Sequence, residues 1–314
     1  MTIYHNFIGI DIGKFTFVVA SHGNKNTQEY SNDSEGISAF ISDYATVDSL
    51  YILETTGGHE RHLLHTLCLK NLPTHRANTR KVKNFIRSLG NDVKTDALDA
   101  KALARYGFER SDRLELFDAP SQKAIELFQL TQRRHDLRLM LVAEKNRAKS
   151  PQIEFIKDSF DTMIKVISQE IQEITLSIST MIANDPTYAE KKKVLKTIPG
   201  IGELIANDLI SLFPELGSLN RRQVASLAGV APRANESGKF VGYRSTGHGR
   251  ALVKPMLFLA AMAARNSNSQ LKEFYENLIA RGKKKMVALV ALMRKIIVIA
   301  NAKLRDLAAH KTAV

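Results

Sequence analysis

Four acidic residues occupy positions at which a carboxylate could do chemistry. Asp96 and Asp99 stand three residues apart in the helix-like segment "KTDALDAKALARYG", and positions i and i+3 of a helix share a face. Asp11 interrupts the apolar run "NFIGIDIG", and Glu54 ends the apolar run "SLYILE" just before "TTGG". A charged residue in a sheet interior is costly unless it is paired or binds a metal, so each position needs an explanation.

The pair on the helix admits two interpretations. In the first, it belongs to a solvated helix face on which Lys94 and Lys101 neutralise Asp96 and Asp99. In the second, the four carboxylates together bind Mg²⁺ or Mn²⁺, because hard oxygen ligands without a cysteine cage select these ions. Two such ions about 4 Å apart activate a nucleophile and stabilise the leaving oxygen in phosphodiester cleavage. Taken jointly, the four positions favour a metal-dependent nuclease-like centre.

A serine in a basic loop is the second candidate group. In "PRANESGKF", Ser237 lies near Arg233, Lys239 and Arg244, whose charges could hold a phosphate and stabilise an alkoxide. Without further context a Ser-Gly pair in a polar loop is more typical of a turn. Ser245, in "YRSTGHGR", is the alternative hydroxyl.

The overall charge indicates an acidic partner. The 314 residues include 45 Lys+Arg and 32 Asp+Glu, which gives a formal net charge of +13, and nucleic acid is the usual partner of so basic a chain. A membrane surface is the competitor, but no apolar run approaches the roughly 20 residues that span a bilayer. The N-terminus does not resemble a signal peptide, and one cysteine excludes an internal disulfide. We therefore expect a protein of the reducing cytoplasm.

The basic residues are concentrated in two clusters. One lies in "THRANTRKVKNFIR", and the other is "RGKKK" at 281–285, directly before a helix-like segment. Each cluster is either a solvated face or a set of phosphate contacts with salt-dependent affinity. The candidate nucleic-acid contacts in these clusters are Arg76, Arg80, Lys81, Lys83, Arg87, Lys283 and Lys284.

The strands and helices predicted around the four acidic residues indicate an α/β domain over 1–112. A strand hairpin followed by alternating strands and helices indicates a layered fold with a mixed sheet. Glu54 would then lie at the carboxyl edge of the sheet, where open α/β sheets bind their ligands. We expect strands at 6–12, 16–21, 28–31, 49–54 and 74–78, and helices at 35–44, 59–70, 79–89 and around 96–107.

The rest of the chain is predicted to be mostly helical, with a segment over 113–190 and a C-terminal domain over 191–314. The first segment fits an antiparallel helix pair or an intermolecular coiled coil, and Pro151 should interrupt it. In the C-terminal domain "IPGIG" at 198–202 predicts a helix–hairpin–helix that exposes amides to a phosphate, or a plain turn. A Gly-rich basic loop at 229–250 separates helices expected near 222–227, 251–266, 269–281 and 286–307.

These motifs together resemble one protein family. "IGIDIGKFTFVVA", "LETTGGHE", "KTDALDAKALARYG", "IPGIGELIA", "LAGVAPRANESGKFVG" and "RGKKKMVALVALMRK" are similar to the RuvC-like DEDD transposases of the IS one-ten family, in the same order along the chain. The resemblance implies an RNase H type fold for the first domain. It assigns the four acidic roles to Asp11, Glu54, Asp96 and Asp99, and the covalent nucleophile to Ser237.

The resemblance also implies a reaction and its partners. Members of this family are bridge-RNA-guided recombinases of bacterial insertion sequences, so the expected partners are donor DNA, target DNA and a structured guide RNA. Ser237 would form a phosphoserine link to DNA, assisted by Mg²⁺ or Mn²⁺ on the four carboxylates. A dimer that assembles into a tetramer, with a site shared between subunits and a nucleoid location, is expected.

Two other functions agree with the same residues. One is a metal-dependent junction resolvase or DNA invertase that uses the carboxylates alone, with water as nucleophile and no role for Ser237. The other is a non-catalytic helix–hairpin–helix nucleic-acid-binding protein in which the acidic residues are structural. Covalent protein–DNA adducts distinguish the first from the serine mechanism, and any strand cleavage excludes the second.

Overall fold

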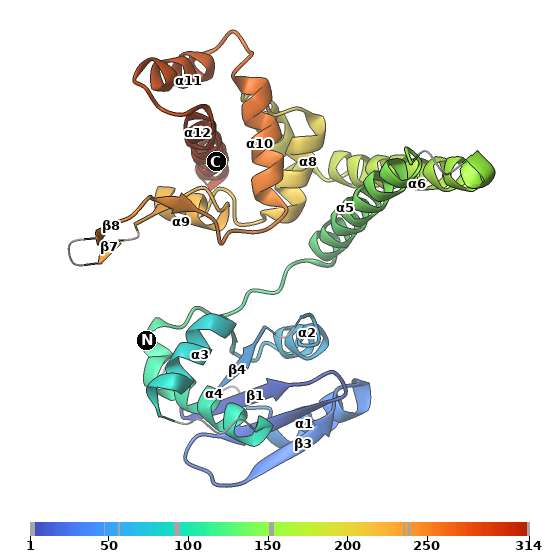
Figure 1. The fold of residues 1–314 in the computed structure, drawn as a ribbon. Helices are drawn as coiled ribbons and strands as arrows, with labels where there is room; N and C mark the ends of the chain where they lie inside the picture. Colours follow the sequence, from blue (N-terminus) through green and yellow to red (C-terminus); the bar gives the residue numbers. More distant parts are fainter. Residues whose placement is uncertain are drawn as a thin grey trace. The chain divides into compact units, whose positions relative to one another are not determined.

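The computed structural model describes residues 4–46, 48–55, 57–90, 95–150, 154–234, 236–237 and 240–312. The chain forms two compact units, Met1–Pro120 and Ser121–Val314, each described here by itself (Figure 1). The helical segment predicted over 113–190 packs within the second unit, because its helices contact the helices that follow it.

The first unit is built on the mixed sheet that the sequence predicts. Its strand order is β3-β2-β1-β4-β5; β1 pairs antiparallel with β2, and β2 with β3, while β1–β4 and β4–β5 are parallel. The parallel pairs are possible because helices connect those strands. The strands are β1 (Asn6–Ile12), β2 (Thr16–Ser21), β3 (Thr27–Ser31), β4 (Ser49–Glu54) and β5 (Thr74–Ala77).

Helices cover both faces of this sheet (Figure 1). Side chains alternate along β1, so that Ile8, Ile10 and Ile12 lie in the core beneath α1 (Ser34–Tyr44) and α2 (Arg61–Leu69). On the opposite face Phe7 lies in a second core together with residues of α3 (Thr79–Ser88) and α4 (Asp96–Arg110). Asp11 shares this second face, and its position follows from the period of two.

The second unit is helical apart from one hairpin. Helix α12 is central, with Leu292, Ile296 and Ile297 fully buried among the other helices. A short 3-10 helix, η1 (Ser111–Arg113), precedes the unit and another, η2 (Glu154–Ile156), lies between its first two helices. The helices are α5 (Gln122–Arg147), α6 (Lys157–Ala183), α7 (Pro186–Lys196), α8 (Glu203–Leu212), α9 (Arg221–Leu227), α10 (Val253–Ala264), α11 (Gln270–Ala280) and α12 (Lys285–Thr312).

Helices α5 and α6 pack against each other as a hairpin within one chain (Figure 1). Of the two arrangements that the sequence left open, the structure contains the antiparallel pair. Arg134 of α5 is 1% exposed and forms a salt bridge with Asp208 of α8, which attaches the hairpin to the rest of the unit. Burial raises the pKa of Asp208 above its ordinary value, although the neighbouring guanidinium opposes this shift.

The turn "IPGIG" connects α7 and α8, as expected for either predicted motif. Gly200 has a φ of 89°, and a Cβ atom there would stand 2.2 Å from the carbonyl oxygen of Ala260 in α10. The glycine is therefore required by its backbone conformation and by close packing on α10. This requirement accounts for Gly200 without a phosphate ligand.

The predicted irregular loop at 229–250 contains four short strands instead. β6 (Pro232–Arg233) pairs with β9 (Ser245–Thr246), and β7 (Glu236–Ser237) pairs with β8 (Phe240–Val241), both antiparallel. Two-residue strands are too short to show a period of two, so no periodicity in the sequence predicts them. We call residues 232–246 the serine hairpin.

Candidate functional site

Asp11 and Glu54 reach the same edge of the sheet on neighbouring parallel strands. The register of β1 and β4 pairs Ile10 with Leu53, so the next residues along each strand are Asp11 and Glu54. Asp11 lies an even number of residues from Phe7, and Glu54 an even number from Ile52, so both carboxylates share the face that packs against α3 and α4. The side chains lie at the carboxyl ends of the two parallel strands, the edge where α/β sheets hold their ligands.

Helix α4 crosses this face in the direction opposite to β1. Near its C-terminal end, a Cβ atom on Gly107 would stand 3.5 Å from Cδ1 of Phe7, at the start of β1. Closer to its N-terminus, a Cβ atom on Gly9 would stand 2.1 Å from the carbonyl oxygen of Ala100 and 2.2 Å from the amide nitrogen of Ala104. Advancing along β1 therefore means moving back along α4.

This geometry brings the aspartates of α4 toward the same edge. Two residues of strand, from Gly9 to Asp11, cover about 6.6 Å, which corresponds to about four residues of helix. Starting from the contact at Ala100–Ala104, that step reaches the first turn of α4, where Asp96 and Asp99 are located. The helix N-terminus favours negative charge there. The four predicted carboxylates thus approach one sheet edge from two strands and one helix.

The four side chains do not form a preassembled metal cage. Within the described residues, no group of three or more His, Cys, Asp or Glu side chains is close enough to hold a metal ion. Their chemistry fits Mg²⁺ or Mn²⁺, because every donor is a hard oxygen.

Cationic side chains border the same edge on α3. Ala77, the last residue of β5, pairs with Glu54, and α3 begins two residues later. The Asn78 side chain caps the helix by accepting from the amides of Arg80 and Lys81, and the Thr79 hydroxyl donates to the Thr55 carbonyl at 3.0 Å. The basic face of α3 is exposed and consists of Arg80, Lys81, Lys83 and Arg87.

Arg76 differs from the other predicted phosphate contacts. Its guanidinium donates to the fully buried Glu60 at 2.6 Å and lies over the ring of Phe117. Glu60 also accepts from the amide of Gly58 at 2.9 Å, so this pair fixes the loop that follows Glu54. Sequence reasoning missed Glu60, although a charged residue two positions after Gly57-Gly58 and just before an apolar helix is a detectable signal.

Ser237 belongs to the second unit and is exposed. In the serine hairpin it pairs with Phe240, while the alternative hydroxyl, Ser245, lies opposite Arg233. Arg244 donates to Glu236 at 3.3 Å, which brings one guanidinium close to the strand of Ser237. Lys94 and Lys239 lie outside the described residues.

The base of the serine hairpin is firmly held. Gly229 and Gly249 approach so closely that a Cβ atom on Gly249 would stand 2.1 Å from the amide nitrogen of Gly229. Arg250 pairs with both carboxylate oxygens of Glu215 and donates to the carbonyl of Leu212 at 2.7 Å. The hairpin therefore projects from a rigid base formed by α8, α9 and α10.

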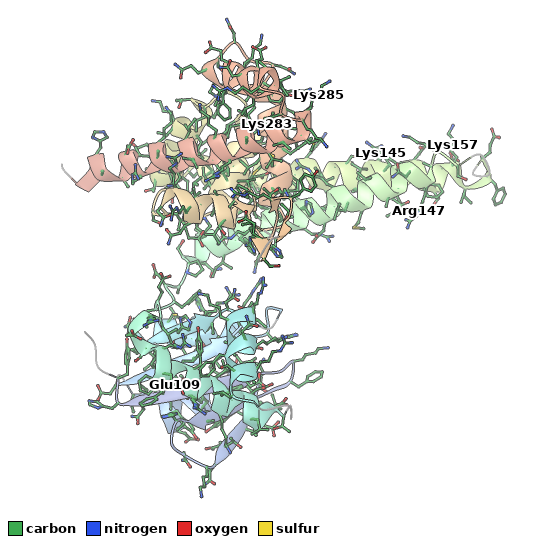
Figure 2. All side chains as sticks on the ribbon, turned by 60° about the vertical axis from the view of Figure 1, so that its left-hand side comes forward. Glu109, Lys145, Arg147, Lys157, Lys283 and Lys285 are labelled. Carbon is green, nitrogen blue, oxygen red and sulfur yellow. The ribbon has the colours of Figure 1, made fainter. Side chains whose placement is uncertain are left out.

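Lys283 and Lys284 lie on the connection from α11 to α12 and are exposed. Figure 2 shows Lys283 and Lys285 at the start of α12. This cluster is separate in sequence from the serine hairpin but belongs to the same unit. None of the helices in the described ranges is long and apolar enough to cross a membrane.

Comparisons with known proteins agree with these features. Residues 8–151 match a DEDD transposase family model of the IS110 type, and residues 192–276 match the model of the transposase IS116/IS110/IS902 family. The pilin gene-inverting proteins of Moraxella lacunata and Moraxella bovis are each 28% identical to the chain over 311 residues, covering 96% of both sequences. An uncharacterised 43.6 kDa protein of insertion element IS110 from Streptomyces coelicolor is 26% identical over 49% of this chain and 38% of its own length.

The two family models match the chain in the expected order: the first covers most of the first unit and continues into the second as far as residue 151, and the second lies within the second unit. The first match contains all four acidic residues, and the second contains Ser237. Full-length similarity to the gene-inverting proteins extends across both units. The chain belongs to the IS110 family of transposases and is a DNA recombinase.

Proposed function

We propose that this recombinase cuts and rejoins DNA with Ser237 as the covalent nucleophile, assisted by Mg²⁺ or Mn²⁺ at Asp11, Glu54, Asp96 and Asp99. The observation that supports the proposal is the register that sets Asp11 beside Glu54 at the ends of adjacent parallel strands, together with the close contact of Gly9 with α4, the helix that carries Asp96 and Asp99. An RNase H type assignment for the first unit agrees with its strand order and its helix-borne acids.

The reaction conserves the energy of the phosphodiester bond. The Ser237 oxygen attacks a DNA phosphorus atom; its proton is lost, a P–O(Ser) bond forms, and the bond to one DNA oxygen breaks. The freed hydroxyl of another strand then attacks the phosphoserine ester, which releases the serine and reseals DNA without an external energy source. A metal ion bound by the carboxylates would neutralise the charge that develops on the phosphate. Arg233 and Arg244, which belong to the same hairpin as Ser237, would bind the same phosphate.

We further propose that a structured RNA selects the DNA sites. The support is the net charge of +13 and the two basic clusters, one in each unit, which provide phosphate contacts for more than one nucleic acid. Two relatives are named for the inversion of a pilin gene, and inversion requires strands to be cut and rejoined at two places. The open side of the turn at Gly202, where no atom lies within 4 Å of an added Cβ, would hold a phosphate.

The α5–α6 hairpin is the proposed contact between subunits in a dimer that assembles into a tetramer. Leu139, Val142 and Leu176 are 58%, 57% and 68% exposed, which leaves apolar surface along the hairpin. Leu176→Glu should shift the mass measured by analytical ultracentrifugation toward the monomer. An unchanged mass would place the subunit contact elsewhere.

Labelled DNA substrates test the chemistry. With Mg²⁺ and the RNA that co-purifies, wild type should form a covalent protein–DNA adduct on a denaturing gel, as should Ser245→Ala. Ser237→Ala should form none while retaining DNA binding, and Asp11→Asn should lose strand exchange. Adducts that survive Ser237→Ala contradict the serine assignment. Cleavage without any adduct favours the carboxylate-only reaction with water, and the absence of a co-purified structured RNA removes the guided part of the proposal.

A further inference from the structure

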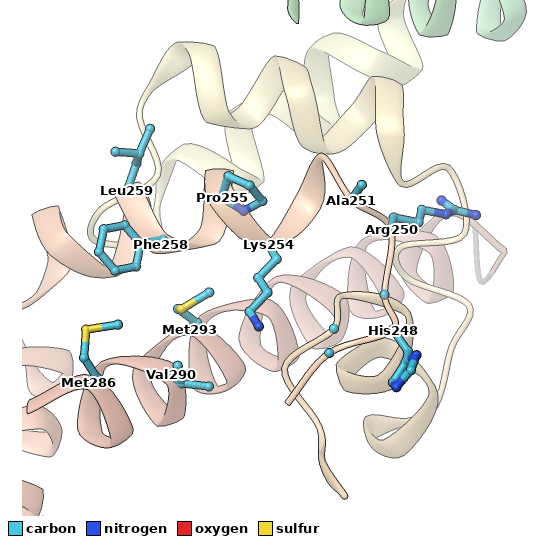
Figure 3. A pocket seen from close by; sticks show the side chains of 13 residues that line it. His248, Arg250, Ala251, Lys254, Pro255, Phe258, Leu259, Met286, Val290 and Met293 are labelled. Carbon is cyan, nitrogen blue, oxygen red and sulfur yellow. The ribbon is translucent and has the colours of Figure 1, made fainter. Parts of the chain in front are cut away.

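A pocket of about 690 Å³ opens between α10 and α12, at the base of the serine hairpin (Figure 3). Phe258 and Leu259 line it from α10, and Met286, Val290 and Met293 line it from α12. Its volume is in the range of pockets that hold small organic groups, such as a nucleotide. The transposition chemistry proposed above gives this pocket no role.

The walls of the pocket combine apolar surface with exposure to water. Leu259 is 62% exposed and Met286 is 59% exposed, and both line the pocket. Large exposed apolar side chains that line a hollow mark a binding site more often than isolated ones do. Phe258 offers an aromatic ring, and the two methionines offer polarisable thioethers that adapt to a flat ring.

The basic side chains around the pocket favour an anionic ligand. The lining residues include Lys254, His248 and Arg250 but no acidic residue. The Lys254 ammonium donates to the Thr246 carbonyl at 3.3 Å, and Figure 3 shows it inside the pocket between Met293 and His248. The cluster Lys283, Lys284 and Lys285 directly precedes Met286 at the rim, so an apolar hollow is bordered by cations. This combination fits a nucleotide whose base lies in the apolar hollow and whose phosphate contacts the lysines.

We propose that this pocket binds an unstacked base of single-stranded DNA beside the phosphate that Ser237 attacks. DNA is favoured because the pocket adjoins the serine hairpin: its lining residue Gly247 directly follows β9, and the Lys254 ammonium donates to the Thr246 carbonyl at 3.3 Å. Ser237 belongs to the same hairpin. A strand bound at Ser237 therefore passes within a short stretch of the pocket. The inference rests on the proposed function of Ser237 but adds a determinant of strand positioning.

An abasic scan measures whether a base enters the pocket. Single-stranded oligodeoxynucleotides, each with one base removed at a successive position, are titrated against the full-length protein and its variants. Phe258→Ala and Met286→Ala alter the pocket, whereas Val287→Ala, at a neighbouring position that is 55% exposed and does not line the pocket, is the matched control.

For the wild type we expect the loss of one particular base to weaken binding about tenfold, since stacking of one base contributes that much. Phe258→Ala should weaken binding of the intact strand by a similar factor, and removal of the same base should then cause no further loss of affinity. Val287→Ala should behave as wild type. 2-Aminopurine at the sensitive position should change its fluorescence on binding to wild type but not to Phe258→Ala. Circular dichroism and thermal melts confirm that the variants fold.

Four results would overturn the inference. If no abasic position changes the affinity while the protein still forms the Ser237 adduct, base binding in the pocket is excluded and the serine mechanism is not affected. A preference for the same bases in RNA, with no sensitivity in DNA, assigns the pocket to RNA instead. A change of oligomeric mass in Met286→Ala would make it a protein interface. If neither adduct nor oligonucleotide binding occurs, the proposed function fails together with the pocket.

Discussion

Gly9 in β1 lies directly against Ala100 in α4, because a Cβ atom at position 9 would stand 2.1 Å from the Ala100 carbonyl oxygen. The atom that blocks it belongs to the backbone and cannot rotate away. This contact determines how far the first turn of α4 lies from the sheet and therefore the spacing between Asp11 and the two helix aspartates. Glycine is required here for close approach of two elements.

Gly9→Ala should consequently displace α4 and destabilise the first unit by about 3 kcal/mol, the upper part of the range for overpacking. Urea unfolding of the full-length protein, monitored by circular dichroism, measures this change. Gly202→Ala is the control, because an added Cβ there meets no atom within 4 Å and the backbone φ is −85°. Equal stability of the two variants would contradict the packing described between β1 and α4.

Binding of Mg²⁺ can be detected without catalysis. If the four carboxylates bind the ion, it should stabilise the folded state by about 2.7 kcal/mol at one hundred times its dissociation constant, and should raise the melting temperature. Asp11→Asn should abolish this increase, whereas Asp112→Asn, which alters an exposed aspartate in an ion pair with Arg113, should keep it. An increase that persists in Asp11→Asn would place the ion elsewhere.

Arg76 and Arg80 should behave differently although both belong to the same basic segment. Arg76→Ala removes the guanidinium that pairs with the buried Glu60 carboxylate and should cost about 3 kcal/mol of stability. Arg80→Ala, on the exposed face of α3, should change stability by less than about 0.5 kcal/mol. It should instead weaken DNA binding and lower the slope of log affinity against log salt by about one. The opposite pattern would assign the phosphate contact to Arg76.

The stability of the first unit should depend on pH through His75. Burial, aided by repulsion from Lys81, lowers the pKa of this histidine, while a hydrogen bond of 2.7 Å to the Glu115 carbonyl opposes the shift. The folded protein therefore holds neutral His75, and its contribution is complete above the ordinary value of about 6.5 and is lost as the pH falls through the lower folded pKa.

His75→Asn, which keeps a donor for the Glu115 carbonyl, should flatten the dependence of unfolding free energy on pH below about 6.5. Urea titrations of the full-length protein at several pH values measure it. His310→Asn, at an exposed position on α12, is the matched control and should retain the wild-type slope. An unchanged slope in His75→Asn would exclude His75 as the titrating group.

Local signals in the sequence were sufficient for most elements. Alternation of isoleucine with Gly9 and Asp11 predicted β1 and the face on which Asp11 lies, and Asn78 and Thr95 are located where helix caps were needed. The short strands of the serine hairpin were not predicted, because pairing across the hairpin and the Gly229–Gly249 contact define them. Neither feature produces a period in the sequence.

By itself, the sequence determined the mixed sheet with its helices, the helical remainder, the basic character of the chain and the resemblance to a transposase family. These follow from side-chain periodicity, cap residues and charge, which act over a few neighbouring residues. Only the tertiary structure decided that Asp11 and Glu54 lie side by side at the ends of adjacent parallel strands. It also decided that α4 runs antiparallel to β1, so that the helix end with Asp96 and Asp99 points toward the same edge of the sheet. It also decided that Arg76 binds Glu60 and that α10 and α12 enclose a pocket. Each of these depends on strand register or on helix packing between residues far apart in the chain, and a local pattern contains neither.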